Sequence, residues 1–98
     1  MPLHPVHKLS VLMPIFNEAR TLRVIVDRVL HSPVQLPIEL VIVDDGSTDG
    51  SREILAELAV RESRIHALYH HRNQGKTAAV RTAIRAMTGD VALIQDAD

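Results

Sequence analysis

The chain has 98 residues, enough for one domain and too few for two. Its 11 basic and 12 acidic side chains give a formal net charge of −1, which excludes the electrostatic footprint of a nucleic-acid-binding protein. The sequence has no cysteine, which excludes disulfides and thiolate metal sites and favours a reducing compartment, so we expect a cytoplasmic protein.

The first third of the chain predicts one strand and one helix. Residues 1–8 form an extension without the apolar stretch of a signal peptide, and the apolar run Leu9–Pro14 predicts the first strand. Asn17 is expected to cap a helix whose apolar side chains recur at i, i+3 and i+4 spacing over residues 22–30. Pro33 ends this helix because proline cannot continue it.

The same alternation of strand and helix continues to the end of the chain. The further elements are a strand at Glu39–Val43, a helix with an apolar face at 54–59, a strand at Ile65–Tyr69, a helix with an apolar face at 79–87 and a strand at Val91–Gln95. Thr48 or Asp49 is the expected N-cap of the second helix, and Gly89 fits the C-terminal cap of the third.

This order of elements predicts an α/β fold, a Rossmann-like three-layer α/β/α arrangement around a mainly parallel four-stranded sheet. Ligands of such sheets bind beyond the carboxyl ends of the strands. The polar clusters of the sequence follow those ends, after Pro14, Val43, Tyr69 and Gln95. We therefore expect them to share one rim.

The first two clusters carry a possible nucleoside site. Pro14, Phe16, Asn17 and Glu18 offer an apolar wall and hydrogen-bonding groups for a base and ribose, the alternative being that Asn17 and Glu18 cap the helix. In the second cluster, Asp44 is expected to accept from a ligand, whereas Asp45 serves either the ligand or the turn at Gly46.

The last two clusters suit a diphosphate and a cation. Gly75 and Lys76 open the third helix, where backbone amides and a basic side chain favour phosphate, the alternative being a solvated helix cap. Asp96 and Asp98 are alternate residues of an extended segment and point the same way, so they can converge on one Mg²⁺ or Mn²⁺ ion.

Together the clusters resemble those of the family-two glycosyltransferases of GT-A fold, especially the dolichyl- or polyprenyl-phosphate sugar transferases. The matching stretches are Val11–Glu18 (VLMPIFNE), Leu40–Gly50 (LVIVDDGSTDG), Asn73–Val80 (NQGKTAAV) and Thr88–Asp98 (TGDVALIQDAD). The resemblance implies an inverting enzyme that transfers a hexose from a nucleoside-diphosphate sugar to an acceptor such as polyprenyl phosphate, peripheral to the membrane in the full-length protein.

The resemblance also implies a role for each cluster. Its nucleotide-sugar-binding residues would be Pro14, Phe16, Asn17, Glu18, Asp44, Asp45, Gly75, Lys76 and Asp96, and its metal ligands Asp96 and Asp98. Phe16 stands where the family often has a tyrosine, which removes a hydroxyl but keeps the ring.

Length is the larger departure from the family pattern. The chain reads as the N-terminal nucleotide-sugar-binding part, residues 1–98, cut after the Asp-x-Asp motif, so the catalytic base is expected beyond residue 98 and no transfer is expected from this chain alone. The edge of Val91–Gln95 would be unpaired, which predicts a homo-oligomer. Two alternatives stay open: a non-catalytic nucleotide-binding or assembly module, and a receiver-like phospho-acceptor domain.

Overall fold

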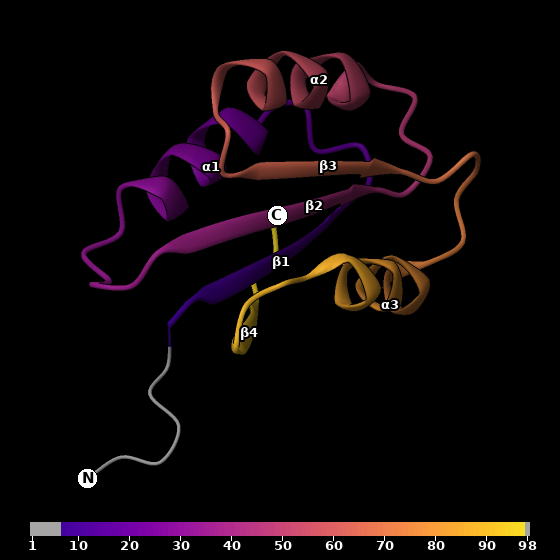
Figure 1. Cartoon of the computed structure of the whole chain (residues 1–98). Coiled ribbons are helices and arrows are strands. Elements are labelled where there is room, and N and C mark those ends of the chain that lie inside the picture. The colour runs from indigo at the N-terminus through magenta and orange to yellow at the C-terminus, as the bar shows by residue number, and fades with distance from the viewer. Residues whose placement is uncertain (1–6, 98) are drawn as a thin grey trace, which may run out of the picture.

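The computed structural model describes residues 7–97. Strands and helices alternate along the chain: β1 (Leu9–Ile15), α1 (Leu22–Leu30), β2 (Ile38–Asp44), α2 (Ser51–Arg61), β3 (Ile65–Tyr69), α3 (Lys76–Ala86) and β4 (Val91–Ile94). The strands form one parallel four-stranded sheet in the order β3-β2-β1-β4. Helices α1 and α2 cover one face and α3 covers the other, as Figure 1 shows, which confirms the predicted three-layer fold.

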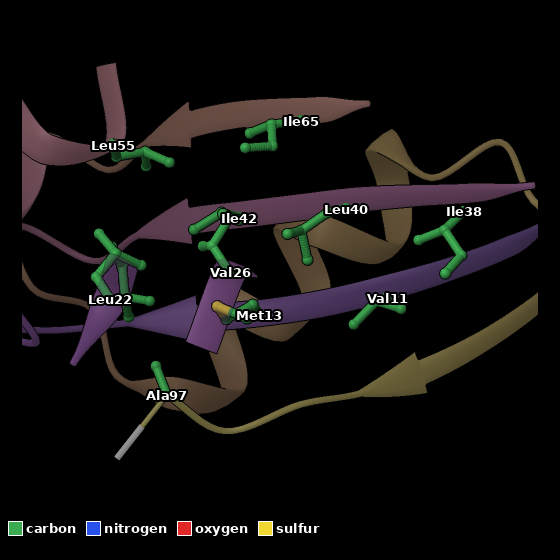
Figure 2. Close-up of a cluster of buried hydrophobic side chains, with 11 residues drawn as sticks. Val11, Met13, Leu22, Val26, Ile38, Leu40, Ile42, Leu55, Ile65 and Ala97 are labelled. Carbon is green, nitrogen blue, oxygen red and sulfur yellow. The ribbon is translucent and has the colours of Figure 1, made fainter. Parts of the chain in front are cut away.

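Strand β2 lies at the centre of the fold and is buried at every position. Side chains of a strand alternate between the two faces of the sheet. Leu40 and Ile42 join the larger core cluster beneath α1 and α2, drawn in Figure 2. Val41 and Val43 join the smaller cluster beneath α3. Even-numbered positions of β2 thus face α1 and α2, and odd-numbered positions face α3.

Helix α1 begins later than the sequence pattern predicted. Its N-cap is Thr21, and Asn17 lies in the preceding loop with a positive φ of 53°. The prediction that Asn17 caps this helix is therefore wrong. The physical reason is that its side chain is occupied elsewhere, because Asn17 Oδ1 accepts a hydrogen bond from the backbone N–H of Thr48 at 2.8 Å.

Two other expected caps are also wrong. The N-cap of α2 is Gly50 rather than Thr48 or Asp49, although Asp49 Oδ1 accepts from the N–H of Ser51 at 3.0 Å. Helix α3 ends with Met87 as its C-cap, so Gly89 does not cap it. A Cβ on Gly89 would overlap Ser10 Oγ, so the close approach of β1 is what requires a glycine there.

A buried carboxylate anchors the α3–β4 connection at the amino ends of the strands. Glu39 accepts hydrogen bonds from Ser10 Oγ at 2.7 Å and from Thr88 N and Oγ1 at 2.8 and 2.9 Å. Burial by itself raises the pKa of Glu39, but the hydrogen bonds from Thr88 and Ser10 outweigh burial, and its pKa lies below the ordinary value of 4.5.

Strand β4 lies at the edge of the sheet, where among residues 7–97 it pairs with β1 alone. Its apolar side chains Val91, Leu93 and Ile94 are 44%, 52% and 52% exposed. An exposed apolar edge strand is a template for association, so the predicted homo-oligomer stays a prediction with a defined surface. No helix in the described part of the chain is long and apolar enough to cross a membrane.

Candidate functional site

An open cleft of about 310 Å³ lies at the carboxyl ends of the strands, beside the start of α3. The predicted residues that line it are Pro14, Phe16, Glu18, Asp45, Gly75, Lys76 and Asp96. They come from the end of β1, from the loops after β1, β2 and β3, from the start of α3 and from the segment after β4. The polar clusters of the sequence therefore do meet along one rim of the sheet.

Asp45 holds the inner wall of the cleft. Its side chain is almost fully buried and accepts hydrogen bonds from His70 Nδ1 at 2.7 Å, from the N–H of Gln74 at 2.9 Å and from the N–H of Gly75 at 2.8 Å. A buried carboxylate needs such donors to offset the loss of water. Asp45 therefore ties the end of β2 to the loop that leads into α3.

Asp44, the stronger candidate of the acidic pair on sequence grounds, is not among the residues that line the cleft. It continues the even-numbered face of β2 and is 0% exposed. Its Oδ2 accepts from the N–H of Ser47 at 3.1 Å and lies 3.6 Å from Arg52 Nη1. None of the described residues donates a hydrogen bond to Oδ1. Its position suits an anchor of the β2–α2 loop.

Asn17 is likewise directed away from the cleft, toward the β2–α2 loop. Besides accepting from Thr48, Asn17 donates its own N–H to Ser47 Oγ at 2.8 Å, and the N–H of Glu18 donates to Ser51 Oγ at 2.9 Å. Asn17 and Ser47 are 30 positions apart in the sequence. A role of Asn17 in binding a base stays a prediction.

Gly46 allows the connection between β3 and α3 to come close to the turn after β2. It has a φ of +80°, and a Cβ there would overlap Asn73 N and lie 2.6 Å from the carbonyl carbon of Arg72. Only glycine accommodates both the left-handed backbone and this contact. The tight turn expected at Gly46 thus packs against the backbone of Arg72 and Asn73, in the connection between β3 and α3.

The start of α3 lines the cleft. Gly75 is the N-cap and Lys76 the first helical residue. The first N–H groups of any helix have no carbonyl partner within it, and together with the helix dipole they favour an anion. Lys76 Nζ pairs with Asp96 Oδ1, and both side chains are more than half exposed, so this ion pair contributes little to stability.

The segment after β4 is fastened from two sides. Ala97 is buried in the core that Figure 2 shows, next to Leu22 and Met13, and its carbonyl accepts from Thr21 Oγ1 at 2.7 Å. Asp96, directly before Ala97, also lines the cleft. Asp98, the second predicted metal ligand, lies outside the described residues.

Oxygen donors at this rim suit Mg²⁺ or Mn²⁺. Between His7 and Ala97, no three His, Cys, Asp or Glu side chains gather closely enough to hold a metal ion. However, Mg²⁺ typically binds through one or two carboxylates together with the phosphates of a substrate. The exposed carboxylate of Asp96 beside Lys76 fits that mode of binding.

Some residues at the site were not among the predicted binding residues. His70 touches Asp45, Asn73 lines the cleft and Thr21 holds the segment after β4. The position of His70 directly after a predicted strand was the available hint for that residue. Thr21 was hidden because its partner is the carbonyl of a residue 76 positions away.

Solved structures of similar fold include complexes with nucleotides. A mannosyltransferase from Pyrobaculum calidifontis, PcManGT in complex with GDP-Man and Mn²⁺, superposes with a TM-score of 0.82 at 27% identity over 98% of this chain and 28% of its own. S. aureus TarS 1–349 in complex with UDP has a TM-score of 0.81 at 23% identity, over 93% of this chain and 27% of its own, which shows the fold alone. The fold is that of the GT-A glycosyltransferases.

Sequence relatives are named as sugar transferases. An undecaprenyl-phosphate 4-deoxy-4-formamido-L-arabinose transferase from Photorhabdus laumondii is 38% identical over 101 residues, covering 100% of this chain and 31% of the relative. The protein of that name from Pectobacterium carotovorum is 38% identical over 96 residues, covering 95% of this chain and 29% of the relative. The chain spans less than a third of the length of these curated relatives.

A match to a whole family covers nearly the entire sequence. Residues 10–98 match the family described as Glycosyl transferase family 2. This match includes every polar segment that meets at the cleft, from Pro14 to Asp96. The chain therefore belongs to glycosyl transferase family 2.

Proposed function

We propose that this chain forms the donor-binding half of an inverting glycosyltransferase, which takes a hexose from a nucleoside-diphosphate sugar and passes it to an acceptor such as polyprenyl phosphate. The observation that carries the proposal is the convergence of Asp45, the start of α3 and Asp96 on one cleft. The relatives named for undecaprenyl phosphate and the neighbour in complex with GDP-Man and Mn²⁺ support it.

Each wall of the cleft would serve one part of the donor. Pro14 and Phe16 offer apolar surface to the base, and Glu18 offers a carboxylate to the ribose. The helix start at Gly75 and the side chain of Lys76 would receive the diphosphate. Since the exposed Lys76–Asp96 pair costs little to open, both side chains are available to rearrange on binding.

A divalent cation belongs to this proposal. Asp96 would hold Mg²⁺ or Mn²⁺, together with Asp98. A bound cation supplies Lewis-acid stabilisation of the nucleoside-diphosphate leaving group. The catalytic base and the acceptor site are expected beyond residue 98, so the chain by itself is expected to bind a nucleotide and to transfer no sugar. A cytoplasmic location, peripheral to a membrane in a longer protein, stays a prediction.

Calorimetry on this chain tests the proposal. UDP, GDP and their sugar conjugates are titrated with and without MgCl₂, and we expect binding that strengthens with the cation. The Asp96→Asn variant should lose the effect of Mg²⁺. Asp27→Asn is the matched control, because Asp27 lies on α1 with its side chain 73% exposed. The absence of binding by any of these nucleotides, or an equal effect of Mg²⁺ on both variants, would refute the proposal.

A second candidate is a nucleotide-binding or assembly module without transfer activity, which the exposed apolar edge of β4 favours. Nucleotide binding combined with a defined oligomer, and the absence of transfer in a longer protein that contains the chain, would support this candidate. Membership of the glycosyltransferase family argues against the phospho-acceptor alternative.

A further inference from the structure

His70 directly follows β3 and contacts Asp45, which lines the cleft. Its side chain is 9% exposed and is not among the residues that line the cleft. Both backbone groups are held, since the N–H donates to the carbonyl of Asp44 at 2.8 Å and the carbonyl accepts from Arg52 Nη1 at 3.0 Å. The backbone that carries the imidazole ring is therefore held in place.

Both ring nitrogens of His70 have partners. Nδ1 lies 2.7 Å from Asp45 Oδ1, and Nε2 lies 2.7 Å from Thr82 Oγ1 on α3. A carboxylate only accepts, so Nδ1 carries the proton shared with Asp45. Thr82 Oγ1 also lies 3.1 Å from the carbonyl of Ala78. Its hydroxyl either donates to that carbonyl and accepts from Nε2, or donates to Nε2, so the ring bridges Asp45 and α3 in either protonation state.

The bridge closes a loop of contacts around the start of α3. Asp45 also binds the N–H groups of Gln74 and Gly75, and Gly75 is the N-cap of α3. The helix is thus held to one carboxylate at two places, directly at its first turn and through His70 at Thr82. Charged or titratable neighbours of the ring are Asp45 itself and, through the backbone of His70, Arg52.

We infer that His70 is a positioning residue for the donor: it fixes the carboxylate of Asp45 and, through the N–H groups of Gln74 and Gly75 that Asp45 binds, the position of the start of α3, which would receive the diphosphate. This inference rests on the proposed function. It assigns His70 no contact with the ligand. The part of His70 that matters is the Nδ1–H donated to Asp45, and the contact with Thr82 serves to aim the ring.

Two amide variants separate the ring nitrogens. In His70→Asn the side-chain NH₂ takes the place of Nδ1 and can still donate to Asp45, whereas in His70→Gln it takes the place of Nε2 and keeps only the contact with Thr82. Binding of UDP and GDP with MgCl₂ is measured by calorimetry, and exchange of the Gln74 and Gly75 amide hydrogens is followed by NMR. Urea unfolding is used to check that both variants are folded.

We expect the Gln variant to bind the nucleotide about tenfold more weakly, as the loss of one charge-assisted hydrogen bond implies, and to exchange the Gln74 and Gly75 amides faster. The Asn variant should stay close to the original chain in both measurements. Equal effects of the two variants would overturn the inference.

If the unsubstituted chain binds neither nucleotide, the proposed function fails, and hydrogen exchange still decides the role of His70. Faster exchange in the Gln variant alone would support the anchoring of Asp45 by Nδ1. Equal exchange in both variants would refute it.

Discussion

Replacing Asp45 by Asn should destabilise the fold far more than the same change at Asp44, although the two residues are adjacent and both buried. Asp45 accepts from three donors, on His70, Gln74 and Gly75. An Asn side chain keeps one acceptor oxygen, which can serve His70 and Gln74, but its NH₂ then faces the N–H of Gly75. One hydrogen bond to a charged group is lost, and the remaining ones become neutral.

The expected size follows from these contacts. A hydrogen bond to a charged group contributes about 1.5–3 kcal/mol, so Asp45→Asn should lower the free energy of unfolding by about 2–4 kcal/mol. At Asp44, an Asn keeps the bond from Ser47 and places its NH₂ where Oδ1 meets no donor among the described residues. What it loses is attraction to the partly exposed Arg52 at 3.6 Å, so we expect a change of about 1 kcal/mol or less.

Urea unfolding followed by circular dichroism measures both variants against the original chain. Equal m-values would show that the same surface is exposed on unfolding, so that the midpoints compare stability directly. The reasoning is refuted if Asp44→Asn costs as much as Asp45→Asn. A smaller loss for Asp45→Asn than for Asp44→Asn would mean that the loop after β3 is not held by the Asp45 carboxylate.

Three further outcomes are expected. Gly46→Ala should destabilise the fold more than Gly50→Ala. The positive φ at either position costs alanine about 1–2 kcal/mol, but only at Gly46 would the added Cβ also overlap the backbone of Arg72 and Asn73. Equal urea midpoints for the two variants would contradict this expectation. Since the pKa of Glu39 is lowered from 4.5, its contribution to stability is present above that value and lost as the pH falls through the folded-state pKa. Below pH 4.5 the unfolding midpoint of Glu39→Gln should therefore depend less on pH than that of the original chain. The same pH dependence in both proteins would argue against the lowered pKa of Glu39. Leu93→Lys on the exposed edge of β4 should reduce self-association in sedimentation velocity, a prediction that a purely monomeric original chain at high concentration would eliminate.

Hydrophobic patterning predicted the strands well. Ile65–Tyr69 has the predicted bounds, and Leu9–Ile15, Ile38–Asp44 and Val91–Ile94 differ from prediction by one residue at one or both ends. For β2, which is buried at every position, the signal is strong because a strand buried on both faces must be a nearly continuous apolar run. The short connections between elements then required a parallel sheet, with its ligand rim at the carboxyl ends of the strands.

The helix starts were predicted less well. Asparagine is a preferred N-cap residue, but Asn17 accepts a hydrogen bond from Thr48, and α1 begins at Leu22. Capping is a local preference that a tertiary hydrogen bond of similar strength can replace. The sequence around Asn17 does not reveal that Thr48, on the β2–α2 loop, is its partner.

The sequence by itself determined that the polar clusters would meet at one rim, because that follows from the order of the elements. Which member of the acidic pair faces the cleft was decided by the tertiary structure. Alternation places Asp44 and Asp45 on opposite faces of β2, but only the packed helices show that the odd-numbered face belongs to α3 and to the cleft. His70 likewise matters through Asp45 and Thr82, which are 25 and 12 residues away along the chain. Contacts over such separations exist only once the sheet and α3 have come together.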